Sequence, residues 1–307
     1  MKKKTINITK PTDEDRNAIR VLVRAREDFQ AQRKRMDNRM GKKADGTDQD
    51  KERLTERALR MEDLGLIAEI ADEARKQEAA IEKNLKKLLK RFPIYTEWLL
   101  GVKGVGTIAA AQIIANIDIH KATTVSKIWQ YAGLNPSMVR GKKRKERKDG
   151  GFDIIQTNDL IRGDRMTAGY VAPFNKGLRT SLCGILADGF IKAQAPYAME
   201  HYYPYKERLA RSENVTTEIR KAGSKPEQIP WKDAKPAHRD RAAKRFMIKA
   251  FIRDLYTAWR TLEGLEVRAP YQEEYLGHRH VGQDLGQIDQ DTRDREASQR
   301  SQDTQDA

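Results

Sequence analysis

The sequence has a single cysteine, few aromatic residues and no long hydrophobic segment. Cys183 stands alone among 307 residues, which excludes an internal disulfide and a Cys-x-x-Cys zinc site and is typical of a reducing compartment. No run of residues approaches the roughly 18 consecutive apolar positions of a membrane span, so an integral membrane protein is excluded. Residues 1–10 are charged and lack the apolar stretch of a secretory signal. We therefore expect a cytoplasmic protein with no membrane partner.

Positive charge is what the sequence has in excess. Lysine and arginine outnumber aspartate and glutamate by 60 to 45, which gives a formal net charge of +15. Nucleic acid is the usual polyanion bound by a protein with this much charge of one sign. The C-terminus is the exception, because residues 281–307 hold seven acidic and three basic residues. We expect disorder in residues 1–11 and in an acidic tail over residues 272–307, because neither has enough apolar side chains to bury.

Residues 12–93 have the pattern of a long helical arm. Thr12 is a good N-cap, and a sparse apolar seam follows it at Ile19, Leu22, Phe29, Met36 and Met40, before a predicted loop over residues 41–50. The next segment carries two complementary heptad series, broken only at Glu78: Leu64, Ala71, Leu85 and Phe92 in one phase, and Ile67, Ala74, Ile81 and Leu88 in the other. Such seams predict a coiled coil. The two arms can pair with each other, or with a second chain to give a homodimer or higher oligomer; the alternative is a solvated helical spacer.

Residues 94–115 predict a helix, a tight turn and a second helix. Glycine permits backbone angles closed to other residues, so Gly104 and Gly106 favour the turn, with Val105 buried between them. The second helix then begins at Thr107, where free N–H groups can bind a phosphate, and Lys103 adds a cation. The pattern resembles the helix-hairpin-helix motif, which binds DNA phosphates through backbone amides without reading sequence. The alternative is a glycine turn between two helices that binds no ligand.

Two further segments are strongly basic. In residues 140–148 like charges repel one another, so we expect a loop that orders on a phosphate backbone, with the bases Arg140, Lys142, Lys143, Arg144, Lys145, Arg147 and Lys148. Residues 236–262 predict a helix with two opposite stripes, an apolar one of Met247, Phe251, Leu255 and Trp259 and a basic one of Arg241, Arg245, Lys249 and Arg253. We expect both basic segments to contact duplex DNA; the alternative in each case is a solvated basic surface.

The sequence contains no complete active site. The acidic side chains lie in helices or in the tail, and no strand-borne set could hold two catalytic metal ions. His278 and His280 form a pair without further ligands, and Cys183 lies in an apolar helical segment. We therefore expect no metal site and no cofactor.

Three motifs, in this order, resemble the C-terminal half of the RuvC-type insertion-sequence transposases, prokaryotic mobile-element recombinases of which some are guided by a bridge RNA. The family has a Pro-Gly-Val-Gly hairpin, a Tyr-x-Gly-Leu-x-Pro stretch and an Asn-x-x-Leu-Arg segment. The matching segments here are residues 103–106 (KGVG), 131–136 (YAGLNP) and 175–179 (NKGLR). With the helical patterns above, the resemblance implies an elongated all-α protein, in which the coiled-coil arm precedes a helix-hairpin-helix transposase-like domain over residues 94–271. It also implies a role in transposition or recombination at the nucleoid, with duplex DNA as partner and a guide RNA or a nuclease chain as further partners.

The chain departs from the family in two respects. Family members begin with a RuvC-like nuclease domain, whereas only a short segment precedes the arm here. The family also places a nucleophilic serine beside a glycine, whereas Arg140 precedes Gly141 here and the nearest serine is Ser137. We therefore expect a protein that binds duplex phosphates without sequence specificity and lacks its own nuclease domain.

Three alternative functions stay open. In the first, Ser137 is the nucleophile of an active recombinase that works with a partner nuclease chain. In the second, the chain is a helix-hairpin-helix DNA-repair glycosylase, for which Asp118 is the nearest candidate catalytic aspartate. In the third, it is a coiled-coil adaptor with no nucleic-acid role.

Overall fold

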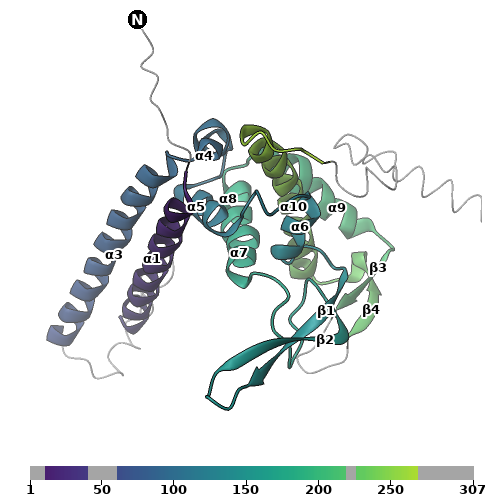
Figure 1. Cartoon of the computed structure of the whole chain (residues 1–307), viewed down its shortest axis with the longest axis horizontal. Helices are drawn as coiled ribbons and strands as arrows, with labels where there is room; N and C mark the ends of the chain where they lie inside the picture. Colours follow the sequence, from purple (N-terminus) through teal and green to yellow (C-terminus); the bar gives the residue numbers. More distant parts are fainter. Residues whose placement is uncertain (1–10, 41–60, 219–225, 269–307) are drawn as a thin grey trace, which may run out of the picture.

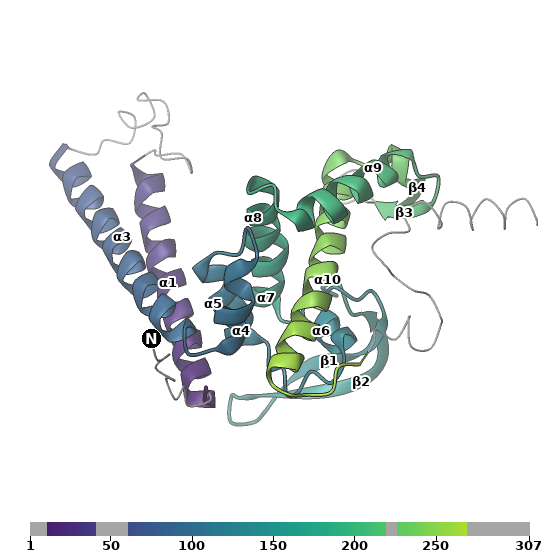
Figure 2. The ribbon, with the colours of Figure 1, turned by 90° about the horizontal axis from the view of Figure 1, so that it is seen from above.

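The computed structural model describes residues 11–40, 61–218 and 226–268. Figures 1 and 2 show three parts: a helical hairpin of α1 and α3, a helical body around α10, and a two-stranded ribbon, β1–β2, that projects from the body. The α-helices are α1 (Asp13–Arg39), α3 (Met61–Leu89), α4 (Pro93–Glu97), α5 (Thr107–Asn116), α6 (Val125–Tyr131), α7 (Lys176–Thr180), α8 (Ala187–Lys192), α9 (Tyr203–Arg211) and α10 (Pro236–Leu262). The 3-10 helices are η1 (Leu99–Gly101) and η4 (Trp231–Asp233), and the π-helices are η2 (Ser181–Leu186) and η3 (Ala198–Tyr202). The strands are β1 (Met138–Glu146), β2 (Phe152–Arg162), β3 (Val215–Glu218) and β4 (Glu227–Pro230).

The expectation of an all-α protein is wrong, because the chain forms two antiparallel two-stranded sheets, β1–β2 and β3–β4. Residues 140–146 of the basic run are part of the first sheet, whereas Arg147 and Lys148 lie in the connection to β2, so the expectation of a loop is wrong for most of the run. Its charges do not prevent a strand, since alternate side chains point to opposite faces and both faces are open to water. The sequence does carry a hairpin signal that we did not use: Asp149-Gly150-Gly151 follows the basic run, and Gly150 has a φ of 77°.

Helices α1 and α3 pair with each other, which settles one of the choices left open for the arm. They lie side by side and antiparallel (Figure 1), as two ion pairs show. Arg91 near the end of α3 pairs with Asp15 at the start of α1, and near the other end Arg75 Nη2 lies 2.6 Å from Asp37 Oδ1. The predicted N-cap at Thr12 is present and is part of a capping box, with Asp15 donating its backbone N–H to the threonine hydroxyl. The seam of α3 is buried as predicted at Ala71, Ala74, Ile81 and Leu85. Formation of an oligomer through the arm stays a prediction.

Glu78, the break in the heptad series, is buried between the two arms. Its carboxylate accepts a hydrogen bond from Arg33 Nε at 2.7 Å and lies 3.7 Å from Arg26 Nη2. A buried charge is tolerated only where partners are in place, so a shift of one helix along the other would leave this carboxylate unpaired. The glutamate therefore specifies the alignment of the two helices at some cost in stability.

The base of the arm packs on α5 and belongs to the same hydrophobic core as the body. Ile19 and Val23 of α1 and Leu85 of α3 join the apolar side chains of α5 in one continuous cluster. Polar contacts support the junction: Arg20 Nη2 donates to the carbonyl oxygen of Ala115, and Gln112 Nε2 donates to Glu27 Oε1 at 2.6 Å. The arm is thus attached firmly at its base.

Helix α10 lies at the centre of the body. The predicted apolar stripe of Met247, Phe251, Leu255 and Trp259 is buried. The prediction that four basic side chains form an open face of α10 is wrong. Arg245, Lys249 and Arg253 are half-buried, and of the four only Arg241 is exposed. Helices α6 and η2 pack against α10 as well, and helical periodicity alone does not show that a second side of a helix is covered.

Some predictions fall outside the described residues, among them the disordered tail, the loop over residues 41–50, the pair His278 and His280, and all but Pro11 of the disordered N-terminal segment. Among the residues that are described, no helix is long and apolar enough to cross a membrane. In the same ranges, no three His, Cys, Asp or Glu side chains are grouped so that they could hold a metal ion.

Candidate nucleic-acid interface

The predicted glycine turn lies between η1 and α5, and one edge of it is covered. Gly104 has a φ of 95°, and a Cβ built on it would lie 2.8 Å from Phe190 Cδ1. In the same way, a Cβ on Gly189 would lie 2.8 Å from the carbonyl oxygen of Gly104. The turn is therefore held against α8 by a close approach of two glycine backbones, while Val105 packs against the core as predicted.

The outer edge of the turn is open. Gly106 is the N-cap of α5, has an ordinary φ of −86°, and makes no side-chain capping bond. A Cβ built on Gly106 would meet no atom within 4 Å, and both Gly106 and Lys103 are exposed. The first N–H groups of α5, from Thr107 onward, thus have no side-chain cap, which is the arrangement that suits an anion. Phosphate binding at this turn stays a prediction.

The β1–β2 ribbon presents the largest set of free cations. Lys142 pairs across the ribbon with Gln156, Arg144 with Ile154 and Lys145 with Asp153, and nearly all of these positions are exposed. Two of the seven bases have ion-pair partners, Lys143 with Asp159 and Arg147 with Asp149 and Asp153. Within the described part of the chain, the other five form no ion pair: Arg140, Lys142, Arg144, Lys145 and Lys148. The ribbon is therefore a solvated, positively charged projection.

A glycine at the base of the ribbon admits an aromatic ring. The register shifts at Gly141, where a Cβ would lie 2.6 Å from the ring of Tyr170. The Tyr170 hydroxyl donates to Asp159 Oδ2 at 2.7 Å, and Lys143 Nζ lies 4.5 Å from the centre of the ring. These hydrogen bonds, from Tyr170 first and Lys143 second, lower the pKa of Asp159, so its carboxylate stays charged. The base of the ribbon is thus fastened to the segment that follows it.

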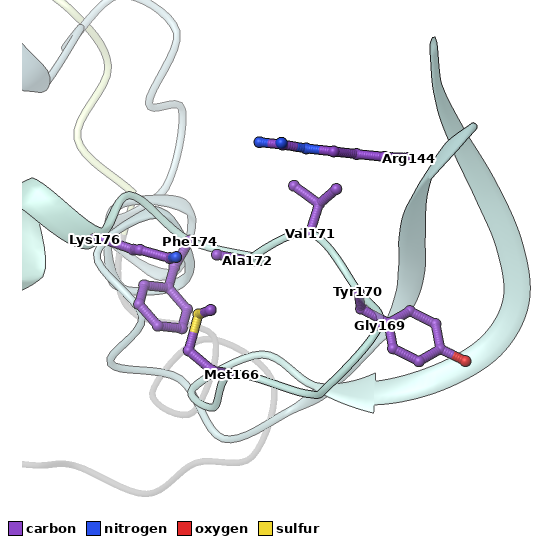
Figure 3. A pocket seen from close by; sticks show the side chains of 8 residues that line it. All are labelled: Arg144, Met166, Gly169, Tyr170, Val171, Ala172, Phe174 and Lys176. Carbon is purple, nitrogen blue, oxygen red and sulfur yellow. The ribbon is translucent and has the colours of Figure 1, made fainter. Parts of the chain in front are cut away.

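A pocket of about 490 Å³ opens between the ribbon and this segment (Figure 3). Arg144 of β1 and Lys176 at the start of α7 bring cations to it from two elements, and the ring of Phe174 and the side chain of Met166 form an apolar part of the wall. The pocket combines apolar surface with positive charge.

The basic residues of α10 are less accessible than predicted. Burial lowers the pKa of Lys249, whose Nζ lies 4.7 Å from the centre of the Trp129 ring. Burial also lowers the pKa of Arg245, with Arg179 as the next cause, and Arg253 Nε donates to Asp254 Oδ1 at 2.9 Å. Helix α10 therefore does not offer a continuous basic stripe to DNA.

The turn and the ribbon lie at opposite ends of one helical run, α7–η2–α8. Gly104 contacts Gly189 in α8, whereas Arg179 in α7 donates to the carbonyl oxygen of Asp164, just after β2. The ten residues from Arg179 to Gly189 span about 15 Å at about 1.5 Å per residue. The structure thus does not join the two predicted contacts at one point.

The motif segments 131–136 and 175–179 are in direct contact. Asn175 caps α7, and its side-chain amide donates to Tyr131 Oη at 2.8 Å and to Asn116 Oδ1 at 3.0 Å. Gly133 has a φ of 68° and faces the Phe174 ring, which a Cβ would approach to 2.6 Å. Residues that are far apart in the sequence therefore form one unit at the base of the ribbon.

The two candidate catalytic residues lie in different surroundings. Ser137 is exposed just before β1, and its carbonyl oxygen accepts a hydrogen bond from Gly163 N at 2.8 Å. Asp118 lies 3.1 Å from Arg16 Nη1 and 3.3 Å from Lys121 Nζ. Burial raises the pKa of Asp118, but the two cations lower it by more. The pKa therefore lies below its ordinary value, and the carboxylate stays ionised. Neither residue is shown to be catalytic.

Sequence reasoning did not assign Lys176 and Arg179 to the interface. Both stand in the segment NKGLR, which we used as a motif but not as a source of cations. Arg179 lies 4.8 Å from the centre of the ring of Phe174, a residue that lines the pocket in Figure 3. The sequence feature that could have identified them is the position of two basic residues close to Asn175, which caps α7.

With this geometry described, comparison with known proteins gives one family. Residues 96–149 match the family model described as Transposase IS116/IS110/IS902 family. The matched segment contains the glycine turn, α5, α6 and β1, so it includes two of the three motifs. No match was found among curated proteins or among solved structures. The match supports the relationship to insertion-sequence transposases and a role in transposition, while the RuvC-type, RNA-guided detail rests on the resemblance of the motifs alone.

Proposed function

We propose that this chain binds duplex DNA during transposition of an insertion sequence, and that it does so mainly through phosphates. The observation that carries the proposal is the β1–β2 ribbon. It projects from the body, and five of its lysine and arginine side chains form no ion pair with any described residue. The transposase family match, which includes β1, supports the same partner.

The shape of the ribbon suits a groove of duplex DNA. The nine residues of β1 extend about 30 Å at roughly 3.3 Å per residue. The major groove is wide enough to admit a two-stranded ribbon. Lysine and arginine on both faces of such a ribbon reach the phosphates on either side, which gives affinity with little dependence on base sequence.

The N-terminus of α5 supplies the second contact in this proposal. It is exposed and has no side-chain cap, and it lies at the other end of the α7–η2–α8 run. The α7–η2–α8 run between the turn and the base of the ribbon is about 15 Å long, and the ribbon extends about 30 Å beyond, so in this proposal one duplex contacts both sites.

A separate nuclease chain and a guide RNA are further partners that the family resemblance implies. An oligomer formed through the arm would present more than one ribbon to the DNA. We also place the protein at the nucleoid, since duplex DNA is its proposed ligand.

Salt dependence of binding tests the proposal. We expect a mobility shift of a short duplex at low salt, and the triple variant Lys142→Ala, Arg144→Ala and Lys145→Ala should flatten the slope of log K against log salt by about one unit per lost phosphate contact. Lys143 is left in place because Tyr170 and Asp159 already engage it.

A matched control removes the same charge from elsewhere. The variant Lys83→Ala, Lys86→Ala and Lys87→Ala takes three exposed lysines from α3 and should keep the wild-type slope. Equal slopes for the two triple variants would remove the ribbon from the interface. No shift of the wild-type protein at low salt would favour the adaptor.

The serine-dependent alternative is tested with the same protein. Wild type and Ser137→Ala are incubated with supercoiled plasmid and Mg²⁺, and nicks or covalent protein–DNA adducts are measured. Adducts that disappear in the variant would establish Ser137 as a nucleophile and refute a purely binding role.

A further inference from the structure

Strand β2 of the ribbon carries large apolar side chains that are open to water. Ile154 is 61% exposed and Leu160 is 62% exposed, and Phe152, at the start of β2 next to the turn, is 58% exposed. A single exposed apolar side chain is ordinary, but several along one projecting element indicate a contact surface. The phosphate contact proposed above makes no use of these side chains.

Two of these apolar residues lie opposite arginines of β1. Arg144 pairs with Ile154 and Arg140 pairs with Leu160, and neither arginine forms an ion pair with a described residue. Residues directly opposite each other in an antiparallel pair share a face, so each arginine is presented together with its apolar partner. The aliphatic stems of the arginines do not cover these partners, since Ile154 and Leu160 both remain exposed.

The contact that fastens the base of the ribbon uses the other face. Successive side chains of a strand alternate between faces, so Lys143 points away from the face that holds Arg144 and Ile154. Lys143 is the residue whose Nζ lies 4.5 Å from the centre of the Tyr170 ring and 3.4 Å from Asp159 Oδ2. The face with Arg144 and Ile154 is therefore not used for this attachment.

The alternation of positive charge and apolar surface selects the kind of partner. A second copy of the same face would bring its arginines against Arg140 and Arg144, and like charges repel. Duplex DNA meets both requirements, because its phosphates suit the arginines and its major groove displays one apolar group, the C5-methyl of thymine.

We propose that Ile154 and Leu160, with Phe152 at the end of the ribbon, contact thymine methyl groups in the major groove, while Arg140 and Arg144 bind the phosphates beside them. This inference rests on the proposed function and deepens it. The ribbon then makes two kinds of contact with DNA: an ionic one, which salt weakens, and an apolar one, which salt does not screen.

The first arm of the test measures the affinity of the full chain for a short thymine-rich duplex over a range of salt concentrations. The double variant Ile154→Thr and Leu160→Thr places β-branched residues at both positions, so the strands should be kept. We expect about tenfold weaker binding at every salt concentration with the wild-type slope, because apolar contacts release no counterions. The control Val21→Thr and Leu66→Gln removes two exposed apolar side chains from the arm and should bind as the wild type does.

The second arm uses the same duplex with uracil in place of thymine, which removes only the methyl groups. The wild type should bind the uracil duplex more weakly than the thymine duplex, and the double variant Ile154→Thr and Leu160→Thr should bind the two equally. Wild-type affinity in the double variant, or equal binding of the two duplexes by the wild type, would overturn the inference, whereas a steep salt slope in the same data would keep the proposed function.

Two further outcomes separate the remaining cases. A wild type that binds neither duplex at low salt would refute the proposed function and this inference with it. Sedimentation of the free protein tests a second copy as the occupant of this face. A lower mass for the double variant than for the wild type would mean that the face pairs with another chain, and would overturn the inference.

Discussion

The substitution Gly104→Ala tests how the glycine turn is built. Gly104 has a φ of 95°, which L-residues rarely adopt, and a Cβ there would lie 2.8 Å from Phe190 Cδ1 and 3.2 Å from the carbonyl oxygen of Gly189. Backbone strain of about 1–2 kcal/mol adds to an overpacking cost of about 1–3 kcal/mol. We therefore expect the free energy of unfolding to fall by about 3 kcal/mol, which corresponds to a Tm decrease of roughly 6–12 °C.

The matched control is Gly106→Ala, two residues later in the same turn. Gly106 has a φ of −86° and open space around its Cα, so alanine should change the free energy of unfolding by less than about 1 kcal/mol. Thermal and urea unfolding of both variants, followed by circular dichroism, measures the difference. Equal losses for the two variants would refute this account of the turn, because only Gly104 combines a positive φ with a close approach to α8.

Two further predictions concern the arm and its base. Glu78→Gln should lower the free energy of unfolding by about 1–2 kcal/mol, because Arg33 and Arg26 each lose one of their two carboxylate partners. Urea unfolding of wild type and variant measures this difference in free energy. A neutral effect would mean that the charge is not needed in the seam. Asp118→Asn should destabilise at neutral pH, since Arg16 and Lys121 hold the pKa of this carboxylate down despite the opposing effect of burial. The contribution of Asp118 is present above its unfolded pKa of about 3.9 and is lost as the pH falls through the lower folded value, so wild type and variant should converge in acid. Curves that stay parallel across that range would contradict the assignment.

The arm was predictable because its pattern is local and repeated. Heptad spacing identified Ala71, Ala74, Ile81 and Leu85 as the buried seam of α3, and residue type identified Thr12 as the N-cap of α1. Spacing also singled out Glu78, but the partners Arg26 and Arg33 come from the other helix and follow only from the way the two helices align.

The structure and accessibility of the basic segments were predicted less well, because accessibility depends on what else packs nearby. The charge of residues 140–148 was evident, but its pairing with β2 was not, and we expected a loop. The four-residue spacing along α10 predicted an exposed face for Arg245 and Lys249, but α6 and η2 cover this face.

Sequence alone determined the excess of positive charge, the two-arm pattern, the glycine turn and the order of three transposase-like motifs, since each of these is written in residue type and spacing. Tertiary structure decided which bases are free, which glycine the turn needs and which arginines are left without counterions. Those properties depend on contacts between segments distant in the chain, such as Gly104 with Gly189 and Asn175 with Tyr131, and no local pattern records them.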